Sequence, residues 1–250
     1  MNQDTILNIC NDVATQIRFD QLETVVGNSD KNAKFLLLAV TNGMYRDVYR
    51  YYPWSWIRRE AQIDVYDKNP ETALPGDFGY YVDNTCQRID GLGKSVIGPY
   101  PAAEWQDLIY NSADTWSHPP TNVNFAIWEK KVHVFPTPVL PDGVSTYPLF
   151  SFIYMNDSVI QEADSPYFIS KFESDGDKPN FDSDLVEAAG LYRALRMLGL
   201  GYADEKAELG MLLKKEAARD GSRAPSSLVG PPRYKILKAN TTGYTRTRGI

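Results

Sequence analysis

The chain changes character within Tyr51-Tyr52-Pro53-Trp54-Ser55-Trp56-Ile57-Arg58-Arg59. Before this stretch, apolar residues recur every three or four positions, the spacing that places side chains on one face of a helix. After it come short alternating segments rich in aromatic and β-branched residues and separated by Pro and Gly, a texture that indicates strands. Because Pro cannot continue a helix, we expect helix to end and sheet to begin at Pro53.

Helices are predicted on both sides of this stretch. In the first half, either Ser29 or Asp30 can cap a long helix, and in the second half Asp182, Ser183 or Asp184 can cap another. The predicted helices cover about 4–18, 31–52, 185–198 and 203–220. Since an amphipathic helix cannot bury its apolar stripe alone, we expect these helices to pack against one another.

The strand candidates lie between the helices, at 59–66, 80–82, 86–89, 122–128, 131–135 and 147–154. The clearest pair is 123–128 and 131–135, joined by Glu129-Lys130 as a hairpin. This turn lacks the Asn-Gly or Asp-Gly signal of a tight primed turn, so the register is left open.

The predicted fold class is α+β. N- and C-terminal antiparallel helices form a helical bundle, with a central β-rich insertion and an extended C-terminal tail. The predicted boundaries place the bundle at 1–57 and 182–221, the insertion at 58–160, an acidic loop at 161–181 and the arm at 222–250.

Composition places the chain among ordinary globular proteins. Hydrophobic residues make up 43% and charged residues 23%, which excludes collagen-like, low-complexity and wholly disordered classes. The start, Met1-Asn2-Gln3-Asp4, lacks a secretory signal, and the longest apolar run, Phe35 to Val40, is too short for a bilayer. We therefore expect a soluble, unexported protein without a membrane partner, in which Cys10 and Cys86 are reduced and buried.

Charge is unevenly distributed along the chain, which has a net charge of −6. From Arg219 to the end there are seven basic residues and one acid, whereas Glu162 to Asp184 holds seven acids and two lysines. The first segment is polar beyond Arg233, and we expect it to stay extended or disordered until a partner orders it. The second reads as an exposed acidic loop.

Motifs for chemistry are few, and we expect no enzyme activity, cofactor or metal. Gly91-Leu92-Gly93-Lys94-Ser95 resembles the end of a phosphate-binding loop, but the distal Gly is replaced by Arg88, so a turn is favoured. Glu173 to Asp177 resembles a calcium loop with its Gly misplaced, and a solvated loop is favoured there, although cation binding is left open. Only His118 and His133 are available as imidazoles, and neither is predicted to be catalytic.

Aromatic residues are abundant, with five Trp and 16 Tyr. Trp54, Trp56 and Trp128 are predicted as core or subunit-interface anchors because each buries a large area. Protein interfaces and sugar platforms use the same residue types.

The order of parts resembles the head-to-tail adaptor proteins of tailed bacteriophages, the family that includes podophage tail tubular protein A. Three features are similar: the aromatic helix end at 51–59, the segment Leu74-Pro75-Gly76-Asp77-Phe78, and the closing helical pair Leu185 to Leu198 and Ala203 to Asp220. The resemblance covers nearly the whole chain.

This resemblance implies a structural virion protein of the head–tail neck, assembled in the host cytoplasm. It implies a homo-oligomeric, dodecameric ring between the portal protein and a downstream tail or nozzle protein, with genomic DNA passing through the lumen without specific binding. Docking of the C-terminal arm on the portal is our hypothesis. Its predicted partner-binding residues are Arg233, Tyr234, Lys235, Ile236, Leu237, Tyr244, Arg246 and Arg248.

Three alternatives are kept open. The basic tail suits a DNA-binding module, and the Trp and Tyr content suits a carbohydrate-binding or carbohydrate-active tail-associated protein. The third is an accessory tail-completion protein of other symmetry or position.

Overall fold

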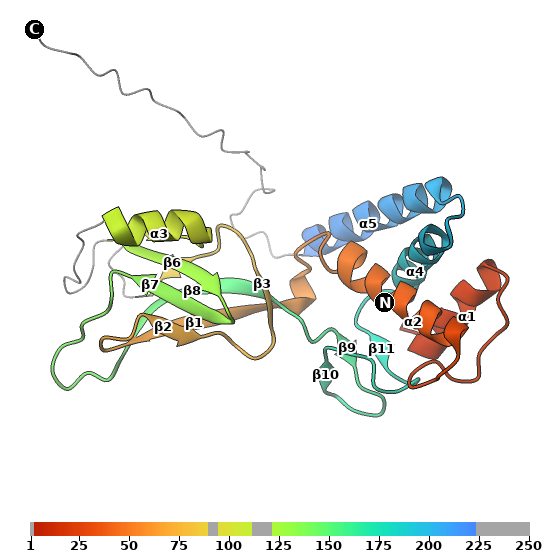
Figure 1. Cartoon of the computed structure of the whole chain (residues 1–250), viewed down its shortest axis with the longest axis horizontal. Coiled ribbons are helices and arrows are strands. Elements are labelled where there is room, and N and C mark those ends of the chain that lie inside the picture. The colour runs from red at the N-terminus through yellow and green to blue at the C-terminus, as the bar shows by residue number, and fades with distance from the viewer. Residues whose placement is uncertain (1–2, 90–94, 112–121, 224–250) are drawn as a thin grey trace, which may run out of the picture.

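The computed structural model describes residues 3–89, 95–111 and 122–223. Two packed regions lie side by side along the long axis, one made of strands with a single helix and one made mainly of helices (Figure 1). The helices are α1 (Ile6–Gln16), α2 (Lys31–Asn42), α3 (Ala102–Asn111), α4 (Ser183–Leu198) and α5 (Ala203–Arg223), with a π-helix η1 (Gly43–Val48) and a 3-10 helix η2 (Ser55–Ile57).

The helix ends follow from local chemistry. Thr5 accepts a hydrogen bond from the backbone N–H of Asn8, and Asp30 accepts from Asn32 and Ala33, so that both side chains cap orphan donors at helix starts. Helix α4 ends at Gly199, whose φ of 69° is the left-handed conformation that glycine adopts without strain. Of the two predicted caps, Ser29 and Asp30, the structure uses Asp30, and the predicted end of the later helix at residue 198 is confirmed.

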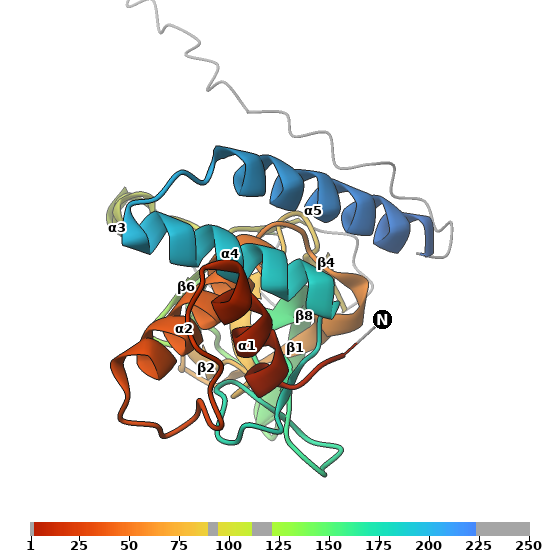
Figure 2. The ribbon, with the colours of Figure 1, turned by 90° about the vertical axis from the view of Figure 1, so that its right-hand side faces the viewer.

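Helix α4 is the centre of the helical region and contacts α1, α2 and α5 (Figure 2). Two glycines allow the α2–η1 rod to cross it backbone to backbone. A Cβ on Gly43 would lie 2.6 Å from the carbonyl carbon of Ala189, and one on Gly190 would lie 2.9 Å from a methyl carbon of Val40. Arg193 on α4 then forms a two-pronged ion pair with Asp47 on η1, at 2.5 and 2.6 Å.

Three sheets are present in the described part of the chain. The first is built on β8 (Thr146–Asn156), which pairs antiparallel with β1 (Arg58–Tyr66), β3 (Phe78–Tyr81) and β4 (Gln87–Arg88). The second has the order β2 (Glu71–Ala73), β7 (Lys131–Phe135), β6 (Val123–Trp128), β5 (Val96–Ile97), with only the β5–β6 pair parallel. The third joins β10 (Phe168–Ile169), β9 (Ile160–Gln161) and β11 (Lys178–Pro179).

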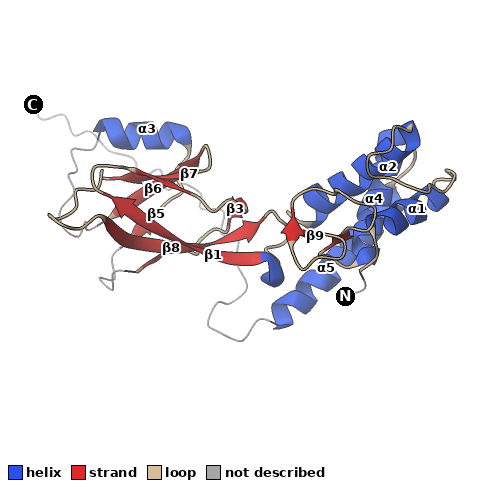
Figure 3. Ribbon diagram, turned by 90° about the horizontal axis from the view of Figure 1, so that it is seen from below, coloured by secondary structure: helices blue, strands red, loops and turns tan. Residues whose placement is uncertain are grey.

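The first two sheets pack face to face around an apolar core. Phe125 of β6 meets Phe150 and Phe152 of β8, with ring centroids 5.0 and 6.4 Å apart. Helix α3 lies on the outer face of the second sheet, where Trp105 packs against Trp128 and Phe135 (Figure 3). Together these layers form the β-rich region.

The expected fold, a terminal antiparallel helical bundle with a central β-rich insertion, is wrong. The structure is α+β, with five α-helices and three sheets in the described residues, and strands dominate its middle. The physical reason is a mixed core: the buried residues around α1, α2 and α4 include Met155 from β8, Ile160 from β9 and Phe181 from the segment before α4. These helices therefore enclose strand residues and do not close on one another alone.

Several smaller predictions can be compared with the structure. The hairpin of β6 and β7 is confirmed, with Asn124 opposite Phe135 and Trp128 opposite Lys131. Its turn residues Glu129 and Lys130 have φ of 52° and 58°, the backbone of a primed turn without its usual Asn or Gly. Helix α3 and the third sheet were not predicted.

The aromatic stretch joins the two regions. Trp54 is fully buried, as predicted for a core anchor, and its indole N–H donates to the carbonyl of Val48 at 2.9 Å. Its ring packs against Tyr52, Trp56 and Phe181. This cluster fixes the end of the helical rod directly against the start of β1.

Candidate functional site

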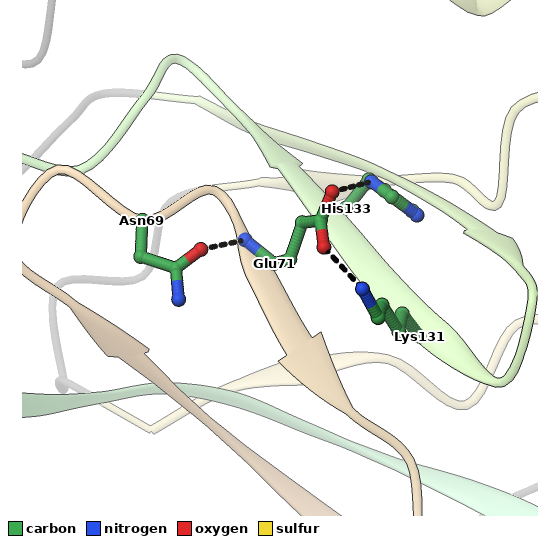
Figure 4. A network of polar contacts seen from close by, with 4 residues as sticks. All are labelled: Asn69, Glu71, Lys131 and His133. Carbon is green, nitrogen blue, oxygen red and sulfur yellow. Dashed lines mark hydrogen bonds and ion pairs between the residues drawn. The ribbon is translucent and has the colours of Figure 1, made fainter.

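The clearest cluster of titratable side chains lies across β2 and β7 (Figure 4). The register places Glu71 opposite His133, and Lys131 projects from the same side of β7 two residues earlier. Lys131 Nζ donates to Glu71 Oε2 at 2.6 Å, and His133 Nδ1 lies 3.7 Å from Oε1. The side-chain oxygen of Asn69 accepts the backbone N–H of Glu71 at 3.0 Å.

The His133 side chain is stacked on the ring of Trp128. Its ring lies 3.8 Å from that of Trp128 at 18°, and Nε2 is buried without a hydrogen-bond partner among the described residues. Burial lowers the pKa of His133, while the nearby Glu71 carboxylate opposes that shift. The hydrogen bond from Lys131 lowers the pKa of Glu71. The Glu71 carboxylate lies between its two partners on β7, Lys131 and His133. We therefore interpret the cluster as a structural ion pair beside a histidine ring that is stacked on Trp128.

The acidic stretch is not simply a solvated loop, as the sequence suggested. Asp177 is completely buried, and its carboxylate accepts hydrogen bonds from the backbone N–H groups of Ala163, Glu173 and Ser174 at 2.7 to 3.0 Å. Asp175 accepts from the backbone N–H groups of Val25 and Val26. Burial by itself would raise the pKa of Asp175, but hydrogen bonds from Thr24, Val26 and Val25 together lower it.

These two carboxylates accept hydrogen bonds from backbone N–H groups. Their hydrogen bonds tie the stretch to the loop after α1 and to the segment just after β9, and they close the loop between β10 and β11, so the charges are part of the fold. In the described residues no group of three or more His, Cys, Asp or Glu side chains is placed to hold a metal ion.

The two cysteines differ in their surroundings. Cys10 is buried as predicted, and burial raises the pKa of its thiol to about 12. Cys86 is only partly buried, and the Tyr81 hydroxyl donates to its sulfur at 3.4 Å. Burial also raises the pKa of Cys86, although the hydrogen bond from Tyr81 acts in the opposite direction.

Several predicted positions lie outside the described residues. They include residues 91–94 of the Gly-rich turn and His118. All of the arm residues also belong to this group: Arg233, Tyr234, Lys235, Ile236, Leu237, Tyr244, Arg246 and Arg248. The portal-docking hypothesis for them stays a prediction.

Sequence reasoning did not identify two adjoining hollows beside η1, of about 370 and 320 Å³. Arg46 and Arg50 line both hollows, Lys130 lines the first and Lys206 lines the second. We call these four residues the basic strip. A signal was present in the four-residue spacing of Arg46 and Arg50, but the two lysines come from the β6–β7 turn and α5, which only the fold brings near.

Exposed apolar side chains mark further surfaces. Met197, Leu198 and Leu200 lie at the corner between α4 and α5, and Met211 lies farther along α5. Tyr167, beside β10, is 73% exposed. Since large exposed apolar groups gather at interaction sites, these positions are candidates for contacts with other proteins.

The chain was also compared with known proteins. No protein-family model matches it, and no curated protein sequence does either. None of the helices in residues 3–89, 95–111 and 122–223 is long and apolar enough to cross a membrane.

Proposed function

We propose that the chain is a structural subunit of a tailed-bacteriophage head-to-tail adaptor. In this role, copies form a dodecameric ring in the neck of the virion, between the portal and a tail or nozzle protein. Genomic DNA passes through the lumen. The proposal rests on the resemblance of residues 51–59 and 74–78 to that family, and the structure adds physical support in the way these residues are used.

The observation that carries the proposal is the aromatic junction at residues 51–59. Besides its ring contacts, it is fastened to α5, because the buried Asp220 carboxylate accepts the backbone N–H of Ser55 at 2.9 Å and also the Ser55 hydroxyl. Trp56 donates its indole N–H to the carbonyl of Asn180 at 3.0 Å. A rigid connection of this kind suits a wall component that must hold two regions in fixed orientation.

The second segment of the resemblance also has a structural use. Asp77 accepts a hydrogen bond from the Tyr154 hydroxyl at 2.8 Å, and its carbonyl accepts the backbone N–H of Asp157 at 2.9 Å. Phe78 donates its N–H to the carbonyl of Pro75 in a turn. Residues 74–78 therefore close the first sheet onto the end of β8, next to the helical region.

Ring formation needs a heterologous contact, in which two different surfaces of one subunit meet the same two surfaces on its neighbours. The apolar corner at Met197 to Leu200 and the exposed Tyr167 belong to different parts of the helical region, so they can serve as two such surfaces. The arm then supplies a separate contact with the portal, through Tyr234, Ile236 and Leu237 as apolar anchors.

The test is attachment to portal-bearing heads. The purified full chain is incubated with heads that lack a neck, and the portal vertex is imaged by electron microscopy. We expect ring-shaped density beneath the portal with the full chain, and none after deletion of residues 233–250. Substitution of Lys31 and Lys34, exposed residues of α2, by Gln is the control and should leave attachment unchanged.

The outcomes separate two levels of the proposal. Unchanged attachment of the deletion variant would reject docking by the arm. Absence of any density with the full chain, at concentrations where the deletion variant and the full chain are both folded by circular dichroism, would reject the adaptor role itself.

A further inference from the structure

We propose that the basic strip (Arg46, Arg50, Lys130 and Lys206) binds the phosphate backbone of duplex DNA. The choice of duplex DNA among polyanions rests on the proposed adaptor role. The inference that the strip binds anions does not rest on that role, because it follows from the placement of the four cations.

The first step is their arrangement. Arg46 and Arg50 line both hollows, so they lie between Lys130 in the first hollow and Lys206 in the second. All four side chains are exposed. They come from the α2–η1 rod, the β6–β7 turn and the start of α5, which are packed elements, so the spacing between the charges is built into the fold.

The second step concerns the ion pairs of these four side chains. Among the described residues, none of the four forms an ion pair. The two acids that line the hollows have other partners: Asp47 is held by both prongs of Arg193, and the Asp157 carboxylate accepts from Ser158 at 3.3 Å. The hydrogen bond from Ser158 leaves the charge on Asp157, so the described lining of the two hollows carries four cations against one carboxylate outside an ion pair, an excess of positive charge on a chain whose net charge is −6.

The third step is the kind of partner. The first hollow adds Thr41 and Asn42, which with Arg and Lys are the side chains that commonly donate to phosphate oxygens. A protein partner would need an apolar centre to its interface, yet Tyr51 is the only large, strongly exposed apolar side chain among the described residues lining the hollows. Shallow hollows with spaced cations fit the phosphate backbone of DNA, in which negative charges recur at a regular spacing.

The experiment measures binding of the full chain to a fluorescent duplex of about 20 base pairs by anisotropy. Four phosphate contacts predict a slope of about −3.6 for log K against log salt. Arg46→Gln/Arg50→Gln should weaken binding about tenfold at about 50 mM salt and make the slope about 2 less negative. The matched control is Lys31→Gln/Lys34→Gln, which removes the same charge from the same rod and should stay within about twofold of the parent chain.

Because the arm is also basic, a second control carries Arg246→Gln/Arg248→Gln. The loss caused by the strip substitutions should appear equally in this background. All variants are checked for folding by circular dichroism, and Lys206→Gln, on the exposed side of α5, provides an independent substitution that should weaken binding about threefold.

The proposal is overturned if the Arg46/Arg50 variant binds DNA within about twofold of its matched control, or if the parent chain shows no binding at about 50 mM salt. Equal competition by polyglutamate at the same charge concentration would overturn the assignment to nucleic acid. Failure here leaves head attachment untouched, since a ring can pass DNA without this contact, whereas failure of attachment with intact DNA binding would reject only the adaptor role.

Discussion

Asp177 shows how much one side chain can contribute to the helical region. Asp177 is completely buried, and its carboxylate accepts hydrogen bonds from three backbone N–H groups, those of Ala163, Glu173 and Ser174. Asp177→Ala should lower the free energy of unfolding by about 3 kcal/mol, because it removes three hydrogen bonds to a carboxylate, each worth on the order of 1 kcal/mol. Urea denaturation measures this.

The control for that prediction is Glu173→Ala, also in the acidic stretch but exposed, which should change stability by less than about 0.5 kcal/mol. Equal effects of the two substitutions would contradict the role assigned to Asp177. Asp177→Asn should also be destabilising, since its amide would face N–H donors on one side.

His133 makes stability depend on pH. Its pKa is lower in the folded chain than its ordinary value of 6.5, so the unfolded chain binds more protons as pH falls. Stability should therefore be highest above pH 6.5 and should fall as the pH drops from 6.5 to the folded pKa. A urea titration of the parent chain and His133→Gln, at pH 7.5 and 5.5, should show a smaller pH effect in the variant.

The same group can be followed directly by NMR, because the chain contains only two histidines. Glu71→Gln should lower the pKa of His133 further, since the carboxylate favours the imidazolium. A His133 signal that titrates above 6.5 would show that the stack on Trp128 does not exclude water as the structure indicates.

At the scale of elements, the β6–β7 turn contains residues that do not favour its backbone conformation. Glu129 and Lys130 both have positive φ, a conformation that Asn and Gly adopt more easily. Glu129→Asn/Lys130→Gly should therefore raise the free energy of unfolding by about 1 kcal/mol. Glu60→Gly, within β1, is the control and should lower the free energy of unfolding. If this substitution also raised the free energy of unfolding, the gain in the turn variant could not be assigned to the positive φ of the turn.

At the crossing of α4 over the α2–η1 rod, a glycine is needed because the backbones leave no room for a Cβ atom. Gly43→Ala would place a methyl group 2.6 Å from the backbone of Ala189, and we expect a loss of about 2 kcal/mol or more as the helices separate. Gly76→Ala meets nothing within 4 Å and should be nearly neutral. Comparable thermal midpoints for the two variants would contradict the close crossing.

These elements also show what sequence could and could not predict. Long periodic segments such as α4 and β8 were recognisable because many residues repeat one spacing. Helix α3 was missed because its apolar spacing, Trp105, Leu108 and Ile109, is short and buries only Trp105, and the two-residue strands of the third sheet have no period at all. Asp177 was misread because seven acids in one stretch suggest solvent, whereas its role depends on N–H groups from Ala163 and Glu173 that only folding brings near.

For the whole molecule, the described regions carry their own cores. The buried residues of both clusters fall within 3–223, so deletion of residues 233–250 should leave the thermal midpoint within about 2 °C of the parent chain. Calorimetry checks this. A large fall would mean that the arm contributes to the fold, and head attachment could then not be read as a test of docking.

The bond between Asp220 and Ser55 has a mechanical consequence. Tension applied to the chain beyond Arg223 enters the molecule at the end of α5, three residues after Asp220, where the two regions meet. The pull is resisted there by a buried carboxylate and by the tryptophan cluster beside it, so that little of it passes to the part of α5 before Asp220. A force applied at this point would thus act on both regions at once.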